Sequence, residues 1–179
     1  MSQPILFVDI VSVDDTLEAV ALRAVLECWN VRVSLHLVGQ AADLVQIFDG
    51  TQSISKHVIL SCHGDERGLL LPELDPSVED TQPYHTVLTP DNLKGFSRLP
   101  DCVVLNTGCL LGTPEFAAAF LHSGCKAYIG AADYPEGDWA MFFVLRFFYE
   151  LACRNRSVKE SYHKAMLSDE TGKFTLYSR

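Results

Sequence analysis

A histidine and a cysteine in this chain each follow an apolar run and each adjoin a glycine. Residues 57–62 are mostly apolar and lead to His63-Gly64, and residues 101–106 lead through Thr107-Gly108 to Cys109. A thiol attacks carbonyl groups as the thiolate, which a nearby imidazole stabilises. An imidazole titrates near neutral pH and therefore serves as general base or acid. The two residues predict a cysteine–histidine catalytic pair if the fold brings them together.

Two glycines beside this pair meet the second requirement of acyl transfer, an oxyanion site. Backbone N–H groups must reach the developing negative charge with no side chain in the way. The glycines are Gly64 and Gly108, and we expect the amides of Gly64 and Cys109 to be the donors.

The order of the expected elements places both residues at one edge of a sheet. Apolar, β-branched runs predict strands at residues 5–11, 31–38, 57–62, 101–106 and 125–130. Helical patterns follow at residues 14–29, 41–48, 113–123, 137–154 and from residue 157. This alternation predicts a doubly wound α/β fold with a parallel sheet and helices on both faces. Ligands bind at the carboxyl ends of such strands, where we expect His63 and Cys109.

The helix expected at residues 14–29 has apolar residues at helical spacing. We expect one face to pack on the sheet and the charged residues Glu18 and Arg23 to lie away from it. The expected packing face consists of Leu17, Ala21, Ala24, Val25 and Cys28.

The chain departs from the alternating order directly after His63. Residues 68–71, Gly-Leu-Leu-Leu, follow without an intervening helix, which predicts a hairpin or a turn back along the sheet edge. Residues 74–90 are rich in Pro, Asp and Ser and predict a long surface loop with a short strand near residues 84–88. A short helix then ends near Gly95. The loop either covers a substrate groove or is a tolerated insertion, and the sequence leaves both open.

Composition favours one globular domain that spans residues 1–179, with 48% hydrophobic residues. A net charge of −9, from 14 basic and 23 acidic residues, argues against a nucleic-acid partner. We expect a cytoplasmic protein without membrane contact, because no signal-peptide pattern begins the chain and no apolar segment is long enough for a bilayer. The six cysteines form no C-x-x-C pair and no zinc spacing, so we expect neither a metal nor a cofactor.

Several motifs resemble the caspase-like (clan CD) cysteine peptidases. Residues 58–64, Val-Ile-Leu-Ser-Cys-His-Gly, resemble their strand–His–Gly motif, and residues 103–109, Val-Val-Leu-Asn-Thr-Gly-Cys, resemble their strand–Cys motif. Segments 116–124, 127–131 and 138–165 follow in the order of the CHAT domains, a branch grouped with caspases, gingipains and separase. The resemblance implies a three-layer sandwich with a mostly parallel central sheet and helices on both faces. It implies a His63–Cys109 dyad, an oxyanion role for Gly64, and cleavage of a peptide bond after a chosen P1 residue.

The chain departs from the caspase pattern at the cysteine. Residues 107–112, Thr-Gly-Cys-Leu-Leu-Gly, replace the Q-A-C-x-G signature, so aspartate specificity is not implied. Asp133, Glu136 and Asp138 follow the fifth strand, on the side where the family builds its S1 pocket. These acids either favour a basic P1 residue or are ordinary acids before a helix. The candidate pocket residues are Asn106, Asp133 and Asp138.

The resemblance also implies partners. A protein or peptide is the expected substrate. CHAT domains are often joined to helical repeats, which are absent here, so a regulatory or substrate-presenting protein is expected as a separate chain.

Two other functions remain open at this stage. Cys62, in a strand–Cys–His–Gly context, resembles the nucleophile of DJ-1/PfpI-like and class I amidotransferase-like enzymes. The segment at residues 68–71 argues against that site, since a nucleophile elbow leads into a helix. The other alternative is a catalytically silent CHAT-type binding module, with the apolar helix at residues 139–152 as its contact surface or as a homodimer interface.

Overall fold

The computed structural model describes residues 5–14, 16–135, 137–166 and 173–179, and these contain a six-stranded sheet. The strand order is β2-β1-β3-β7-β8-β9. The first five strands pair in parallel, and β9 pairs antiparallel with β8. The strands are β1 (Phe7–Val13), β2 (Arg32–Val38), β3 (His57–Ser61), β7 (Val103–Asn106), β8 (Ala127–Ala131) and β9 (Phe174–Ser178).

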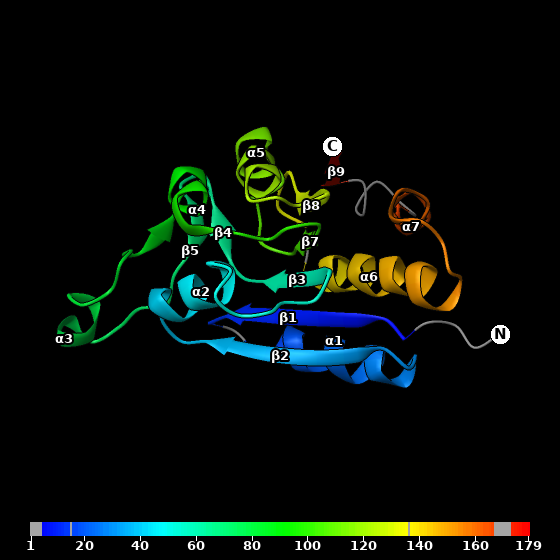
Figure 1. Ribbon diagram of the computed structural model, residues 1–179, viewed down its shortest axis with the longest axis horizontal. Coiled ribbons are helices and arrows are strands. Elements are labelled where there is room, and N and C mark those ends of the chain that lie inside the picture. The colour runs from blue at the N-terminus through cyan, green and yellow to red at the C-terminus, as the bar shows by residue number, and fades with distance from the viewer. Residues whose placement is uncertain (1–4, 15, 136, 167–172) are drawn as a thin grey trace.

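Helices cover both faces of this sheet, which confirms the expected three-layer sandwich. Alternate residues of each strand face opposite sides, so both sides must be apolar. On one face Ile59 and Leu105 pack among residues of α1 (Leu17–Cys28), α6 (Gly137–Phe148) and α7 (Val158–Ala165). On the other face Val58 and Val104 pack among residues of α2 (Ala41–Phe48), α4 (Pro90–Phe96) and α5 (Pro114–His122). Figure 1 shows these layers.

Two of the predicted helix starts, those of α5 and α7, are confirmed, and both are capped by side chains. The Thr113 hydroxyl accepts the Phe116 N–H at the start of α5. Ser157 and Glu160 form a reciprocal capping box at the start of α7. Each cap joins residues three apart in the chain, so the signal for these helix starts is local.

A second, small sheet follows His63. Its strands are β4 (Gly64–Asp65), β5 (Gly68–Leu70) and β6 (Val87–Leu88), and all pair antiparallel. The expected hairpin is therefore confirmed. In Figure 1 this small sheet and α3 (Pro76–Glu79) lie at the end toward which β1, β2 and β3 point.

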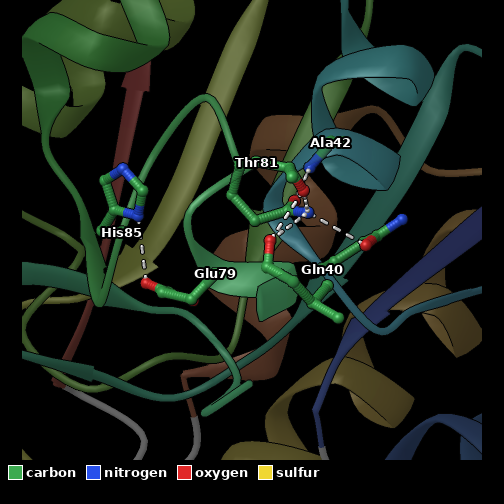
Figure 2. Close-up of polar contacts among 7 residues, drawn as sticks. Gln40, Ala42, Glu79, Thr81 and His85 are labelled. Carbon is green, nitrogen blue, oxygen red and sulfur yellow. Dashed lines mark hydrogen bonds and ion pairs between the residues drawn. The ribbon is translucent and has the colours of Figure 1, made fainter. Parts of the chain in front are cut away.

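The loop between β5 and β6 is fastened to the start of α2. The Gln82 side chain is buried, accepts the Ala42 N–H (3.1 Å) and donates to Gln40 Oε1 (3.0 Å). Figure 2 shows these contacts and the 3.2 Å contact between His85 Nδ1 and Glu79 Oε1. The bonds to Gln82 satisfy backbone and side-chain groups of α2, so this loop forms part of the fold.

One expectation from the sequence is wrong, and one strand was missed. The buried residues of α1 are Ala19, Leu22 and Leu26, whereas Leu17 is 79% exposed. Helix α1 carries apolar residues nearly all round, and so helical spacing does not select one face. The antiparallel strand β9 was not predicted, because its five residues form a strand only by pairing with β8.

The last part of the chain holds one irregular turn. Helix α6 continues as a π-helical turn at Tyr149–Cys153, within the range predicted as one helix.

No helix in the described ranges combines the length and the apolar character needed to cross a bilayer.

Candidate active site

Strands β3 and β7 bring His63 and Cys109 to the same sheet edge. The two strands are parallel neighbours with Leu60 opposite Asn106, as the sequence analysis expected. His63 and Cys109 both line a cavity of about 210 Å³. The full lining is Glu18, Ser61, Cys62, His63, Thr107, Cys109, Pro135, Ala140 and Met141. The cavity therefore collects residues from α1, from the ends of β3 and β7, from the segment before α6 and from the start of α6 itself.

The loop after Cys109 is fastened to β8 and β9 by hydrogen bonds. Leu110 N–H donates to Asp133 O (3.2 Å), and Gly112 N–H donates to Ala131 O (2.7 Å). Tyr128 Oη donates to Leu111 O (2.6 Å) and Tyr177 Oη donates to Gly112 O (3.0 Å). These bonds fix the backbone beside the thiol. Tyr177 belongs to β9, so the strand that sequence reasoning missed helps to hold this loop.

The glycines beside the pair are required by close packing. A Cβ on Gly64 would overlap the Cys109 carbonyl oxygen and lie 2.7 Å from Leu111 Cγ. A Cβ on Gly108 would lie 2.5 Å from Leu111 Cδ1 and 3.0 Å from Cys62 Sγ. The histidine and cysteine loops therefore touch through their backbones. This packing is a second physical reason for glycine, besides the access to backbone N–H groups that the sequence suggested.

The surroundings of the Cys109 thiol favour its protonated, neutral form. Burial raises its pKa above the ordinary value, and the Asp133 charge raises it further, whereas Lys173 acts in the opposite direction. The His63 side chain is exposed. In the described residues no hydrogen bond joins the imidazole to the thiol, although both line the cavity. Unliganded active sites often have such loose geometry, which tightens around substrate.

The Cys62 thiol is held by a structural contact. Cys62 Sγ donates to Asn106 Oδ1 (3.4 Å), and the same oxygen accepts the Gly108 N–H (2.8 Å). Burial, followed by the charge of Glu18, raises the pKa of Cys62 well above its ordinary value. A buried thiol with a raised pKa is a poor nucleophile. The hairpin after His63 also differs from the helix that a nucleophile elbow requires.

Glu18 is the residue in the cavity that sequence reasoning missed. It was expected to lie away from the sheet, yet its Oε2 accepts hydrogen bonds from Ser61 Oγ (2.5 Å) and Thr107 Oγ1 (2.9 Å). Ser61 ends β3 and Thr107 follows β7, so one carboxylate bridges both strand ends. Its position in the first turn after β1, at the carboxyl edge of the sheet, is a signal that the sequence contained.

The three candidate pocket residues are not among those that line the cavity. Asn106 is fully buried and supports the loop of Cys109. Asp133 and Asp138 are exposed, and their carboxylates accept the N–H groups of Tyr134 and Trp139. Glu136 lies outside the described residues. The segment around these acids contributes Pro135, Ala140 and Met141 to the cavity wall instead.

A hydrogen bond links the hairpin to that segment. Tyr134 Oη donates to Glu66 Oε1 (2.8 Å), and this bond raises the pKa of Tyr134 to about 12. Within the described ranges no group of three or more His, Cys, Asp or Glu side chains is arranged to hold a metal ion.

Comparison with solved structures gives matches over nearly the whole chain. It is similar to Saccharomyces cerevisiae separase in two separase–securin complexes, with TM-scores of 0.54 and 0.52, identities of 10% and 14%, and coverage of 99% and 97% of this chain. It is also similar to a secreted C11 cysteine protease from Bacteroides thetaiotaomicron in complex with an irreversible peptide inhibitor (TM-score 0.50, 13% identity, 90% of this chain). The chain spans 12% of the separase chains and 58% of the C11 protease chain. No protein-family model and no curated protein matches the sequence.

Matches at identities of 10–14% show the fold alone, and that fold agrees with the mostly parallel six-stranded sheet described above. This chain has a caspase-like α/β fold.

Proposed function

We propose that the protein is a cysteine endopeptidase in which His63 and Cys109 form the catalytic dyad. The observation that carries the proposal is that both residues line one cavity, at the ends of adjacent parallel strands, within a caspase-like fold. Protein or peptide is the substrate. The cavity has room for one side chain beside the thiol.

The dyad supports a two-step hydrolysis. Cys109 Sγ loses its proton to His63 and attacks the carbonyl carbon of the cleaved peptide bond, which forms a tetrahedral oxyanion. The amides of Gly64 and Cys109 stabilise this oxyanion. The C–N bond breaks as His63 returns the proton to the leaving amine, which leaves a thioester. Water then attacks the thioester, gives its proton to His63 and releases the carboxylic acid, and the thiol regains that proton.

We propose that binding of a substrate or partner strengthens the contact between His63 and Cys109. The pKa of Cys109 is raised by burial, and the imidazole is exposed. His63 reaches the thiol transiently in the free protein, and a substrate or a separate regulatory protein would hold the two side chains together. Separase was solved with securin, and a protein partner of this kind fits the present chain as a proposal.

Selective alkylation tests the proposal. Limiting iodoacetamide near neutral pH is applied to the parent, to His63→Ala and to His122→Ala, and the modified cysteines are mapped by mass spectrometry. His122 is an exposed histidine at the end of α5 and serves as the matched control. We expect Cys109 to react fastest and to slow about tenfold or more in His63→Ala only.

The other outcomes separate the competing functions. Preferential labelling of Cys62 would favour the DJ-1-like reaction and contradict the dyad. Slow and equal labelling of all six cysteines, unchanged by His63→Ala, would favour a binding module. A positive result leads directly to peptide substrates, with Cys109→Ala as the inactive control.

A further inference from the structure

An apolar groove lies on the face of α6 that points away from the sheet. It encloses about 330 Å³, and its walls are Trp29, Phe142, Leu145, Arg146 and Tyr149. The wall residues from α6 and the turn after it recur at three- and four-residue spacing, so they share one helix face. Phe142 is 53% exposed, although large apolar side chains are usually buried. This groove, here called the α6 groove, is therefore an apolar surface in contact with solvent.

The aromatic walls of the α6 groove are held in fixed positions. Trp29 follows α1 directly and lies edge-on to Tyr149, with 5.6 Å between the ring centroids. The guanidinium groups of Arg146 and Arg154 lie over the Tyr149 ring, at 5.7 and 5.4 Å from its centroid. Fixed rings lose little conformational entropy when a partner covers them. Tryptophan, tyrosine and arginine are also the commonest anchors of protein interfaces, so these walls are suited to binding.

A positively charged surface adjoins the α6 groove. A second cavity, of about 420 Å³, shares Arg146 and Tyr149 with the groove. Its cationic residues, here called the basic cluster, are Arg146, Arg154, Arg156 and Lys164. Residues 146–164 hold five of the 14 basic residues of the chain and two of its 23 acidic ones, although the net charge is −9. The cluster is thus a positive surface on an acidic protein.

Glu150 orders the basic cluster without cancelling its charge. The buried carboxylate accepts hydrogen bonds from Arg146 Nη2 (2.8 Å) and Arg156 Nε (2.7 Å), so one anion meets two cations. Arg156 uses Nε for this bond, which leaves its terminal N–H groups for another anion. Within the part of the chain that the structure describes, Arg154 and Lys164 form no ion pair with a carboxylate. The cluster therefore carries uncompensated positive charge beside the groove.

We propose that the α6 groove and the basic cluster together bind an acidic segment of a partner protein, in which a large apolar side chain is flanked by carboxylates. The apolar side chain fills the groove, and the carboxylates pair with Arg154, Arg156 and Lys164. The groove volume of about 330 Å³ is at the low end of the roughly 300–1,000 Å³ of ligand pockets, which suits side chains of a short segment.

This binding surface is separate from the candidate dyad. None of the residues of the α6 groove or of the basic cluster lines the cavity of His63 and Cys109. The inference therefore holds whether or not the protein cleaves peptide bonds.

Charge argues against the other occupants of such a surface. A second copy bound about a two-fold axis would present the same patch, and the two basic clusters would repel each other. An anionic membrane or a nucleic acid would attract the cluster but repel the rest of a chain with net charge −9. A short acidic segment meets the cluster alone, and the concave groove matches its apolar side chain.

Calorimetric titration with designed peptides tests the proposal. The probes are acetyl-Glu-Asp-X-Leu-Asp-Glu-amide peptides in which X is Leu, Phe or Trp, and each matched control peptide has Gln and Asn in place of Glu and Asp. We expect the best acidic probe to bind with a Kd of about 100 μM or below at low salt. The neutral counterpart should bind at least about tenfold more weakly, and added salt should weaken the acidic probe, because the charged contacts are screened.

Matched variants locate the binding surface. Phe142→Ser removes an apolar wall, and the double variant Arg154→Gln, Lys164→Gln removes two exposed charges. Val78→Ser, at an exposed apolar residue of α3, and Lys94→Gln, at a surface lysine of α4, are the controls. We expect at least about a tenfold loss of affinity in each variant of the surface and a change within about twofold in each control. Thermal unfolding of every variant checks that the fold is intact.

Several results would overturn the proposal. They include no binding of any acidic probe, equal affinity for acidic and neutral peptides, and unchanged binding in both variants of the surface. Phe142-dependent binding to phosphatidylserine vesicles without peptide binding would assign the surface to a membrane. A dimer in analytical ultracentrifugation that dissociates in Phe142→Ser would assign it to a second copy of the chain.

Discussion

The contact between the histidine and cysteine loops makes a sharp prediction for Gly64. A Cβ at this position would overlap the Cys109 carbonyl oxygen and lie 2.7 Å from Leu111 Cγ, which is 0.7 Å short of ordinary van der Waals contact at 3.4 Å. One neighbour is backbone, and Leu111 is fully buried. Neither can move aside without displacing its loop. Gly64→Ala therefore has to push the two candidate catalytic loops apart.

The expected cost follows from overpacking in a closed site. Inserting one methyl group into such a site costs about 1–3 kcal/mol in the free energy of unfolding. At about 2–4 °C per kcal/mol for a domain of this size, that lowers Tm by roughly 2–12 °C. A displacement of this order beside a nucleophile also lowers reactivity by up to about 10²-fold, because attack requires close alignment.

Thermal unfolding and the rate of Cys109 alkylation are the measurements, and Gly39→Ala is the matched control. A Cβ on Gly39 meets nothing within 4 Å, so the control should keep or slightly raise Tm. Equal Tm values for the two variants, with an unchanged Cys109 rate in Gly64→Ala, would refute the argument that packing requires glycine.

Two further predictions concern charged groups. Burial raises the pKa of Asp9, but hydrogen bonds with His36 (2.5 Å) and Ser55 N–H (2.6 Å) outweigh it, and the net pKa is lowered. Its stabilisation is present above the ordinary pKa of about 4 and is lost as pH falls through the lowered folded-state value. Asp9→Asn should lower the free energy of urea unfolding by about 2 kcal/mol at pH 7. Below about pH 4 the variant should lose less additional stability than the parent, and parallel pH profiles of the two proteins would contradict this. Asp133→Asn should lower the pKa of Cys109, because the Asp133 charge raises it, and should speed iodoacetamide labelling at neutral pH about twofold; a slower rate would reverse the assigned sign.

The main elements of the fold were predictable because their signals are local. Apolar runs fixed β3 and β7, the Thr113 and Ser157 caps fixed the starts of α5 and α7, and the segment after His63 fixed the hairpin. Parallel pairing of β3 with β7 then followed from the β-α-β order. This is why the relation of His63 to Cys109 could be stated before any coordinates.

The buried face of α1 could not be predicted from the local sequence. Apolar residues surround most of the helix, and three of the five residues assigned to the packing face, Leu17, Ala24 and Cys28, are exposed. The same error led to the expectation that Glu18 lies away from the sheet, whereas it binds Ser61 and Thr107 at the sheet edge. Only packing of α1 on the sheet and against α6 selects Ala19, Leu22 and Leu26 as the buried residues.

The sequence by itself determined the layers, the sheet edge and the two residues that meet there, since each depends on hydrophobic pattern and chain order. The tertiary structure decided what surrounds them. Glu18 meets Ser61 and Thr107 across separations of 43 and 89 residues, and Tyr177 meets Gly112 across 65. Contacts at such distances along the chain leave no periodic or spacing signal, because they arise only when separate elements dock. The positions of His63 and Cys109 thus follow from local sequence, whereas the Glu18 charge in the cavity that they line depends on packing.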